Sequence, residues 1–275
     1  MVSIQNLKFS YGRQIVFNNI NLQLEPGKIY GLLGQNGVGK TTLLKIISGF
    51  LKVNKGECTV NGFYPFDRFP QFLEDVFFVP EDFIAPDTIV NDYARLRGEF
   101  YPEYDSNKFG RLMTDFEVNG NFKFNKLSYG QQKKALIAFA LSTNTKLILL
   151  DEPSNGLDIP SKSQLRKVIS EASTDDSCII ISTHQVRDLE NLIDPIIILD
   201  QNGVLLNEST ERIAQKLLFS FSNNPDNSAL YNELTPGGYI SVKKNDTGYE
   251  TKVNIEALFN TTLKNKTEIS EIFNR

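Results

Sequence analysis

The sequence contains few cysteines and no apolar stretch long enough to cross a bilayer. Cys58 and Cys178 are the only cysteines among 275 residues, and both lie in apolar, strand-like surroundings. Such thiols are typically buried, so we expect two free cysteines in a reducing compartment rather than a disulfide framework. The longest apolar runs, Leu147–Leu150 and Ile196–Leu199, fall far short of the ~20 residues of a membrane span. If the chain acts at a membrane, another chain must supply the span.

An excess of basic residues is also missing. The chain has 29 basic and 33 acidic residues, a net charge of −4 and a pI near 5.3, which argues against a nucleic-acid binder. The first residues, Met1–Phe9, alternate polar and apolar side chains like a strand, so we expect no signal peptide. Hydrophobic residues make up 40% and charged residues 23%, as in an ordinary globular protein. A large domain with a small appendage, or two modest domains, would fit this length.

The first half of the chain reads as strands followed by a glycine-rich loop. Short β patterns fill Val2–Phe9, Gln14–Phe17 and Ile20–Leu24. A fully apolar strand at Ile29–Leu33 then runs into the glycines, and Thr41–Ser48 reads as a helix that stops at Gly49.

The middle of the chain favours a parallel sheet with an insertion. Continuous apolar strands at Lys146–Leu150, Cys178–Ser182 and Ile196–Leu199 are typical of parallel strands buried on both faces. Residues 85–125 are instead rich in charged and aromatic side chains at helical spacing. We read them as part of a helical insertion over about residues 85–140.

The last part of the chain has a different character. Ser222–Ser228 reads as a polar linker, and Tyr239–Val253 shows weak strand alternation around Asn245-Asp246. A final amphipathic helix covers Ile255–Leu263, and its continuation toward Phe273 is left open. We therefore expect a main domain over residues 1–210 and an accessory element over residues 211–275.

The strongest motif fits the phosphate-loop pattern G-x-x-x-x-G-K-[ST] and lies between a predicted strand and a predicted helix. Glycines let backbone N–H groups surround phosphate oxygens, and the helix N-terminus adds positive potential. We expect Lys40 to reach the β and γ phosphates and the Thr41 hydroxyl to ligate Mg²⁺. The alternative is a glycine-rich turn with a solvated lysine. The motif comprises Gly34, Gln35, Asn36, Gly37, Val38, Gly39, Lys40, Thr41 and Thr42.

A second motif is the acid pair Asp151-Glu152, which ends the apolar strand Leu147–Leu150. Both acids should lie at the carboxyl edge of the sheet, where α/β folds bind ligands. Asp151 would hold Mg²⁺ and Glu152 would act as general base on the attacking water. Solvated acids after a strand are the alternative.

Three further features depend more on context. Ser128 and Gln131 have the spacing of a capping box, and with Gly130 they could also present a helix N-terminus to a γ-phosphate of a second subunit. His184, the only histidine, follows the strand Cys178–Ser182 and is a candidate phosphate sensor. Asp158 either caps the helix that begins near Pro160 or lies at a dimer interface.

In their order and spacing, these motifs resemble those of ABC transporter nucleotide-binding subunits over about residues 2–206. The resemblance implies a P-loop NTPase core with a mostly parallel sheet, an N-terminal antiparallel β subdomain, an inserted helical subdomain and a small C-terminal accessory element. It implies that Tyr11 stacks on adenine and that Glu81, where the family commonly has glutamine, offers an oxygen to Mg²⁺ beside Thr41 and Asp151. The run Leu127–Gln132 resembles the signature segment of the family, and Tyr129 stands where that segment usually has glycine.

The resemblance also implies a function, namely ATP hydrolysis that powers a membrane transporter with separate transmembrane subunits. The Pro80-Glu81-Asp82 run resembles a branch of small bacterial exporter ATPases, which favours export. Expected cofactors are ATP and Mg²⁺. Expected partners are the transmembrane subunits and a second nucleotide-binding subunit, identical or a paralogue, that meets this one head to tail. The chain would then lie on the cytoplasmic face of the membrane.

Two other functions remain as alternatives. An ABC ATPase that acts on ribosomes or DNA usually carries two cassettes or a long coiled coil, and neither is seen in this sequence. A regulatory subunit that binds ATP with little turnover is the second alternative, and the presence of Glu152 and His184 argues against it.

Overall fold

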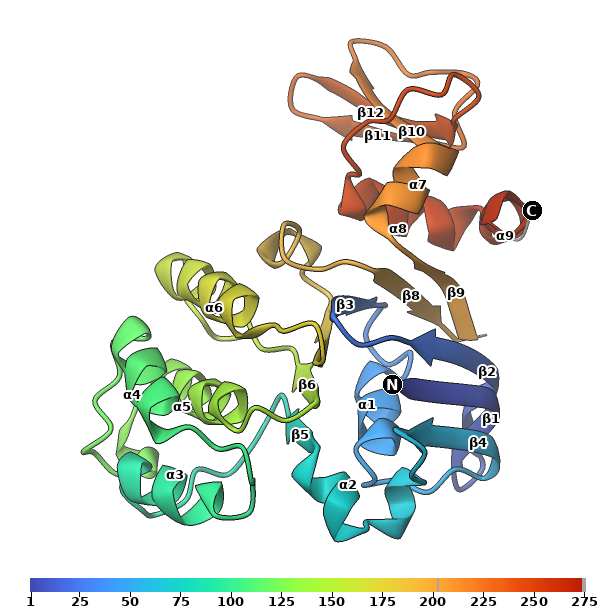
Figure 1. Ribbon diagram of the computed structural model, residues 1–275. Helices are drawn as coiled ribbons and strands as arrows, with labels where there is room; N and C mark the ends of the chain where they lie inside the picture. The colour runs from blue at the N-terminus through green and yellow to red at the C-terminus, as the bar shows by residue number, and fades with distance from the viewer. Residues whose placement is uncertain (202, 274–275) are drawn as a thin grey trace.

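The computed structural model describes residues 1–201 and 203–273. At its centre lies a six-stranded sheet in the order β5-β6-β7-β3-β8-β9 (Figure 1). Neighbouring strands run parallel, except that β8 and β9 pair antiparallel. The strands are β3 (Lys28–Leu33), β5 (Val76–Val79), β6 (Leu147–Asp151), β7 (Cys178–Thr183), β8 (Ile196–Asp200) and β9 (Gly203–Glu208). The predicted mostly parallel α/β core is confirmed.

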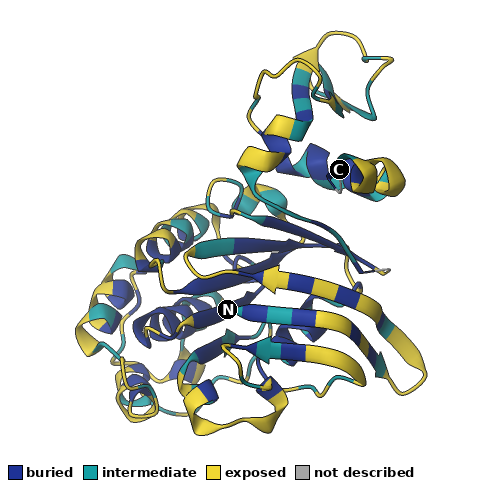
Figure 2. Cartoon of the chain, turned by 45° about the vertical axis from the view of Figure 1, so that its right-hand side comes forward, coloured by how far each residue is buried: buried dark blue, intermediate teal, exposed yellow. Residues whose placement is uncertain are grey.

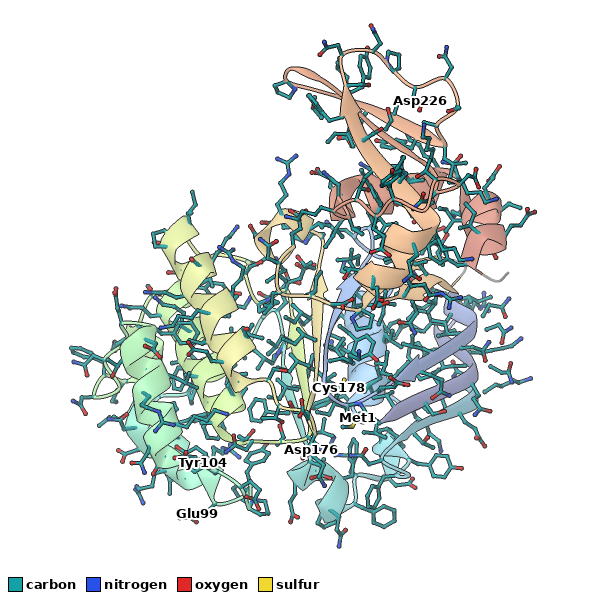
Figure 3. The ribbon with its side chains drawn as sticks, turned by 45° about the horizontal axis from the view of Figure 1, so that its top comes forward. Met1, Glu99, Tyr104, Asp176, Cys178 and Asp226 are labelled. Carbon is teal, nitrogen blue, oxygen red and sulfur yellow. The ribbon has the colours of Figure 1, made fainter. Side chains whose placement is uncertain are left out.

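The central strands are buried on both faces, as their uniform apolarity indicated. Every residue of β6, β7 and β8 is buried. In β6 the side chains alternate between two cores: Ile148 and Leu150 pack on the side of the helical insertion, and Leu147 and Leu149 pack toward the N-terminal part of the chain. The free thiol of Cys178 lies in this sheet (Figure 3), and burial raises its pKa to about 12.

A separate three-stranded antiparallel sheet, in the order β2-β1-β4, forms the N-terminal subdomain. Its strands are β1 (Val2–Tyr11), β2 (Gln14–Leu24) and β4 (Lys55–Val60). Their residues alternate between buried and exposed, which is visible as banding in Figure 2. The two strands predicted at Gln14–Phe17 and Ile20–Leu24 are one strand, because irregular pairing with β1 lets β2 continue through the polar residues between them.

Helix α1 (Lys40–Ile47) follows the glycine-rich loop and ends close to the predicted position. Gly49 has φ +76°, and a Cβ there would lie 2.2 Å from the carbonyl oxygen of Pro65, so only glycine fits this stop. Two short helical segments, η1 (Pro65–Asp67) and α2 (Pro70–Glu74), then lead into β5.

The helical insertion lies between β5 and β6 and packs around an aromatic core. It contains α3 (Val90–Gly98), α4 (Ser106–Asp115), the turn η2 (Phe124–Lys126) and α5 (Tyr129–Ser142). Phe139 of α5 meets the rings of several aromatic residues from α3, α4 and the neighbouring loops. Helix α6 (Ile159–Ala172) runs beside α5 and connects β6 to β7 (Figure 1), and the turn η3 (Val186–Asp188) follows β7.

The last residues form an antiparallel sheet with three helices around it. The elements are α7 (Thr210–Lys216), β10 (Leu217–Ser222), β11 (Tyr231–Thr235), β12 (Gly238–Lys244), α8 (Ile255–Lys264) and α9 (Lys266–Phe273), with the strands in the order β10-β12-β11. No helix among the described residues is long and apolar enough to cross a membrane.

One expectation for this region is corrected, and one point left open is decided. Strand β12 ends at Lys244, although strand alternation was expected as far as Val253. The side chain of Asn245 bonds instead to the backbone of Ala214, Thr247 and Tyr249. The hairpin between β11 and β12 turns instead at 236–237. The helix predicted at Ile255–Leu263 is confirmed as α8. It does not continue unbroken to Phe273, because the backbone of Asn265 (φ −125°, ψ 52°) is not helical and α9 begins after it.

Candidate functional site

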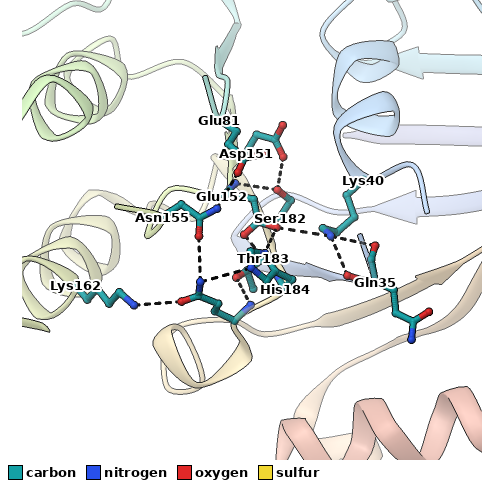
Figure 4. A network of polar contacts seen from close by, with 12 residues as sticks. Gln35, Lys40, Glu81, Asp151, Glu152, Asn155, Lys162, Ser182, Thr183 and His184 are labelled. Atoms are coloured by element: carbon teal, nitrogen blue, oxygen red, sulfur yellow. Dashed lines mark hydrogen bonds and ion pairs between the residues drawn. The ribbon is translucent and has the colours of Figure 1, made fainter. Parts of the chain in front are cut away.

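The glycine-rich loop between β3 and α1 holds Lys40 against its own backbone. Nζ of Lys40 donates to the carbonyl oxygens of Gly34 at 2.8 Å and Gln35 at 3.4 Å. The loop enters α1 through Gly39 at φ +108°, where a Cβ would lie 2.7 Å from the ring of Phe17. Nζ also lies 3.6 Å from Oε1 of Glu152, so the loop brings a buried ammonium to the acid pair (Figure 4).

Asp151, at the end of β6, is fully buried beside the neighbouring strand. Parallel pairing of β6 with β7 sets Asp151 opposite Ser182, whose hydroxyl donates to Oδ1 at 2.5 Å. The other oxygen, Oδ2, is buried and has no hydrogen-bond partner among the described residues. A buried carboxylate oxygen without a donor is suited to a hard cation such as Mg²⁺.

Glu152 adopts a backbone conformation that is unusual for a residue with a side chain. Its φ of +45° lies in the left-handed region. The backbone N–H donates to the carbonyl and hydroxyl oxygens of Ser182, at 3.1 and 3.0 Å. The carboxylate meets His184 twice, with Oε1 at 2.8 Å from Nδ1 and Oε2 at 3.3 Å from the backbone N–H (Figure 4).

A cavity of about 520 Å³ lies in front of these groups. It extends from the N-terminal sheet across the glycine-rich loop to the ends of β6 and β7. The structure therefore gathers residues far apart in the sequence around one space. The predicted site residues that line it are Tyr11, Asn36, Gly37, Gly39, Lys40, Thr41, Thr42, Glu81, Glu152 and His184.

Other predicted residues of the loop support the cavity rather than line it. Gly34 and Gln35 offer their carbonyl oxygens to Lys40. Val38 is buried in the apolar core between the sheets. Asp151 lies below the surface of the cavity, next to Glu152.

The predicted residues of the signature segment and Asp158 do not line this cavity. Ser128 caps α5 and forms a reciprocal capping box with Gln131. Gly130 packs near Gly156 and Leu157, which precede α6. Asp158 caps α6 through the backbone N–H of Ser161, and hydrogen bonds from Ser161 hold the pKa of its carboxyl below the ordinary value.

Glu81 and Tyr129 join the signature segment to the cavity through hydrogen bonds. The Tyr129 hydroxyl donates to the backbone oxygen of Glu81 at 2.8 Å, and Nδ2 of Asn155 donates to Oε1 of Glu81 at 2.8 Å. Burial, together with Asp82 and Glu81, raises the pKa of Tyr129. The tyrosine that replaces the usual glycine thus fixes the loop that carries Glu81.

Sequence reasoning missed several residues of the site. Ser182 and Asn155 bond to Asp151 and Glu81, while Gln14 and Val16 line the cavity beside Tyr11. One signal was present for Ser182, since it is a polar residue at the end of the apolar strand Cys178–Ser182, which was predicted to belong to the same parallel sheet as Leu147–Leu150.

A phosphate loop at the end of one parallel strand, with an acid pair at the end of another, defines this protein as a P-loop nucleotide-binding protein. Residues 17–155 match the model of the family described as ABC transporter. The lantibiotic transport ATP-binding protein SrtF of Streptococcus pyogenes is 30% identical over 212 residues, which cover 75% of this chain and 90% of that protein.

Solved structures agree with this assignment. The ATP-binding cassette MJ0796, in a dimeric post-hydrolysis state bound to ADP and Pi, superimposes with a TM-score of 0.67 at 25% identity and covers 76% of this chain and 98% of its own. The structure of an ATP binding subunit of an ABC transporter superimposes with a TM-score of 0.70 over 78% of this chain and 91% of its own, and at 23% identity this likeness concerns the fold alone. The chain belongs to the ABC transporter family, as an ATP-binding subunit with ATPase activity.

Proposed function

We propose that this subunit hydrolyses ATP with Glu152 as general base and thereby drives an exporter whose transmembrane subunits are separate chains. The observation that carries the chemistry is the position of the Glu152 carboxylate at the wall of the cavity. Its Oε1 lies 2.8 Å from Nδ1 of His184 and 3.6 Å from Nζ of Lys40. A carboxylate held between an imidazole and an ammonium is placed to accept a proton beside a phosphate.

The nucleotide would lie along the cavity with its base toward Tyr11 and its phosphates on the backbone N–H groups of the loop that precedes α1. Lys40, on releasing the carbonyl oxygens of Gly34 and Gln35, would bind the β and γ phosphates. Thr41, Asp151 and Glu81 would hold Mg²⁺, and the unpartnered Oδ2 of Asp151 supports this set. The bound cation would neutralise charge on the phosphate oxygens.

Glu152 then removes a proton from the attacking water, and His184 orients this carboxylate and contacts the γ-phosphate. The remaining predicted residues, Ser128, Gly130, Gln131 and Asp158, would act on the nucleotide of a second subunit. Their exclusion from this chain's own cavity supports that assignment. We infer a head-to-tail pair that closes on ATP and opens after hydrolysis.

Export is inferred from two observations. The run Pro80-Glu81-Asp82 resembles a branch of small bacterial exporter ATPases, and one relative is named for lantibiotic transport. We propose that the subunit lies on the cytoplasmic face of the membrane through its partners. An apolar cleft of about 440 Å³ between β5 and the helical insertion is a suitable docking place for a transmembrane subunit, because Phe50 and Phe100 at its rim are exposed.

The variant Glu152→Gln tests this proposal. It should bind ATP, accumulate as a dimer and lose turnover by about 100-fold or more, because the amide cannot accept the proton. Phosphate release and light scattering in the presence of ATP measure the two effects. Glu99→Gln, an exposed residue of the insertion (Figure 3), is the matched control and should behave as the parent. Parent-like turnover in Glu152→Gln would remove Glu152 from the role of base.

A further inference from the structure

Lys133 of helix α5 is a buried cation that meets the backbone of Glu152. The side chain is 0% exposed, although lysine is almost never fully buried without a partner. Its Nζ donates to the carbonyl oxygen of Glu152 at 2.7 Å, and within the described residues this is the single hydrogen bond of an ammonium that has three donors. The nitrogen also lies 5.6 Å from the centre of the Tyr129 ring.

This hydrogen bond completes a clamp on both polar backbone groups of Glu152. The N–H is held by Ser182 of β7. The C=O accepts from Nζ of Lys133 on α5 at 2.7 Å and, at the longer distance of 3.2 Å, from the backbone N–H of Asn155. Glu152 has φ +45°, a conformation that persists only where the surroundings hold it. Because the direction of a side chain follows from its backbone, the clamp sets where the Glu152 carboxylate points.

The charge of Lys133 is costly for the fold and is placed beside acids. Burial lowers the pKa of Lys133, and the carboxylates of Glu81, Asp82, Glu152 and Asp151 oppose this shift. An apolar side chain of similar size would avoid the cost of burying an ammonium. Stability alone therefore gives no reason for a lysine at this position.

We propose that Lys133 is a positioning residue for ATP hydrolysis, which holds the Glu152 peptide so that its carboxylate faces Lys40 and His184. The inference rests on the proposed role of Glu152. Lys133 also links two parts of the chain, since it lies on α5 two residues after Gln131 of the capping box. Contact at that end of α5 would reach the general base through a single side chain.

The test compares Lys133→Met with Lys134→Met. Lys134 is the next residue of the same helix and is 8% exposed. It donates to the Ser161 hydroxyl at 3.3 Å and makes no hydrogen bond to Glu152 within the part of the chain that the structure describes. Lys133→Met should lower kcat about 10- to 100-fold, because a displaced catalytic group costs that much, with the Kd for AMP-PNP within twofold of the parent. Its Tm should equal or exceed that of the parent, whereas Lys134→Met should keep the parent kcat.

Three outcomes would overturn the inference: a kcat of Lys133→Met within twofold of the parent, an equal fall in both variants, or a fall in kcat that follows a fall in Tm. If Lys133→Met does not fold, Lys133→Gln is measured in its place. The glutamine side chain is one atom shorter than that of lysine and carries no charge. The experiments distinguish the proposed general base, Glu152, from the proposed positioning residue, Lys133. Parent-like turnover in Glu152→Gln refutes the general base, whereas an inactive Glu152→Gln beside a fully active Lys133→Met refutes only the positioning role.

Discussion

At the scale of single residues, the site depends on Ser182 at the end of β7. Its hydroxyl donates to Oδ1 of Asp151 and accepts from the backbone N–H of Glu152, so one side chain orients both acids. Ser182 is fully buried, and no solvent can replace it. It therefore acts on both proposed roles, Mg²⁺ binding and proton transfer.

Ser182→Ala should raise the Mg²⁺ concentration that ATP hydrolysis requires. Without the hydroxyl, one oxygen of a fully buried carboxylate loses its donor, which costs about 1–3 kcal/mol in the free energy of unfolding. We expect kcat to fall about tenfold, equivalent to ~1.4 kcal/mol, and the Mg²⁺ concentration for half-maximal turnover to rise. Steady-state phosphate release over a range of Mg²⁺ concentrations measures both.

Ser48→Ala is the control for this variant. Ser48 is also buried, but its hydroxyl donates to the carbonyl oxygens of Leu44 and Lys45 in α1, away from both acids. If the two alanine variants showed the same Mg²⁺ dependence, the link between Ser182 and Asp151 would have no part in binding the metal.

The site residues that were predicted from the sequence differ from those that were missed in one respect, which is how far along the chain their interaction partners lie. Lys40 and the acid pair belong to short motifs whose neighbours in the chain explain them. Ser182, Asn155 and Lys133 act on groups 31, 74 and 19 residues away. A local pattern cannot show such contacts, because they depend on which strands and helices become neighbours.

At the scale of elements, the loop between β10 and β11 is organised by Asp226 (Figure 3). Its carboxylate accepts from the hydroxyl and backbone N–H of Ser228 and from Nζ of Lys243 on β12, at 2.6 to 2.9 Å. These contacts hold the pKa of Asp226 well below its ordinary value of 3.8, with the Ser228 hydroxyl as the largest cause. The segment predicted as a polar linker is therefore a loop closed by one carboxylate.

Asp226→Asn should lower the Tm at neutral pH, and the difference should shrink progressively once the pH falls below the unfolded pKa of 3.8. A carboxyl whose pKa is lowered by folding stabilises the folded state above its unfolded pKa, and this contribution is lost as the pH falls through the folded pKa. Calorimetry from pH 7 to pH 2 follows the difference between the two proteins. Asp246→Asn, which removes an exposed ion pair with Lys244, is the control and should shift the Tm little. A constant difference across this pH range would contradict the prediction.

Elements were predicted well where one local property decides them. The apolar strands β6, β7 and β8 and the glycine stop of α1 are such cases, because burial on both faces and a positive φ each demand particular residue types. The end of β12 was missed and the break at Asn265 could only be left open. Both depend on asparagine side chains that bond to distant backbone as well as to their own surroundings.

At the scale of the whole molecule, the accessory part packs on the core. Helix α8 contacts β8 and η3, and α9 contacts β9. Leu258 and Ile269 are fully buried there, and Arg187 of η3 pairs with Glu256 at 2.7 Å. Figure 1 shows both helices lying between the central sheet and the small sheet of β10, β11 and β12. The apolar contacts outweigh the exposed ion pair, because solvent screens its charges.

Leu258→Ala should destabilise the whole chain rather than the accessory part alone. A buried leucine reduced to alanine costs about 2–4 kcal/mol, and a shared core predicts one calorimetric transition that shifts as a unit. Leu234→Ala, at a side chain 71% exposed, is the control and should shift the Tm little. The Kd for AMP-PNP should stay unchanged in both, because no described residue after Gly203 lines the nucleotide cavity. Two separate transitions, with only one shifted, would show that the accessory part folds independently.

By itself the sequence determined the chemistry and the kinds of element. Glycines at fixed spacing before a lysine specify a phosphate loop, and runs of apolar residues specify strands that must be buried, since both requirements are local. The tertiary structure alone decided the strand order, in which β3 lies between β7 and β8. That order brings Lys40 to Glu152 and His184, and it brings Lys133 against the Glu152 peptide. Such pairings are set by the packing of the entire core, so no short stretch of the chain contains them.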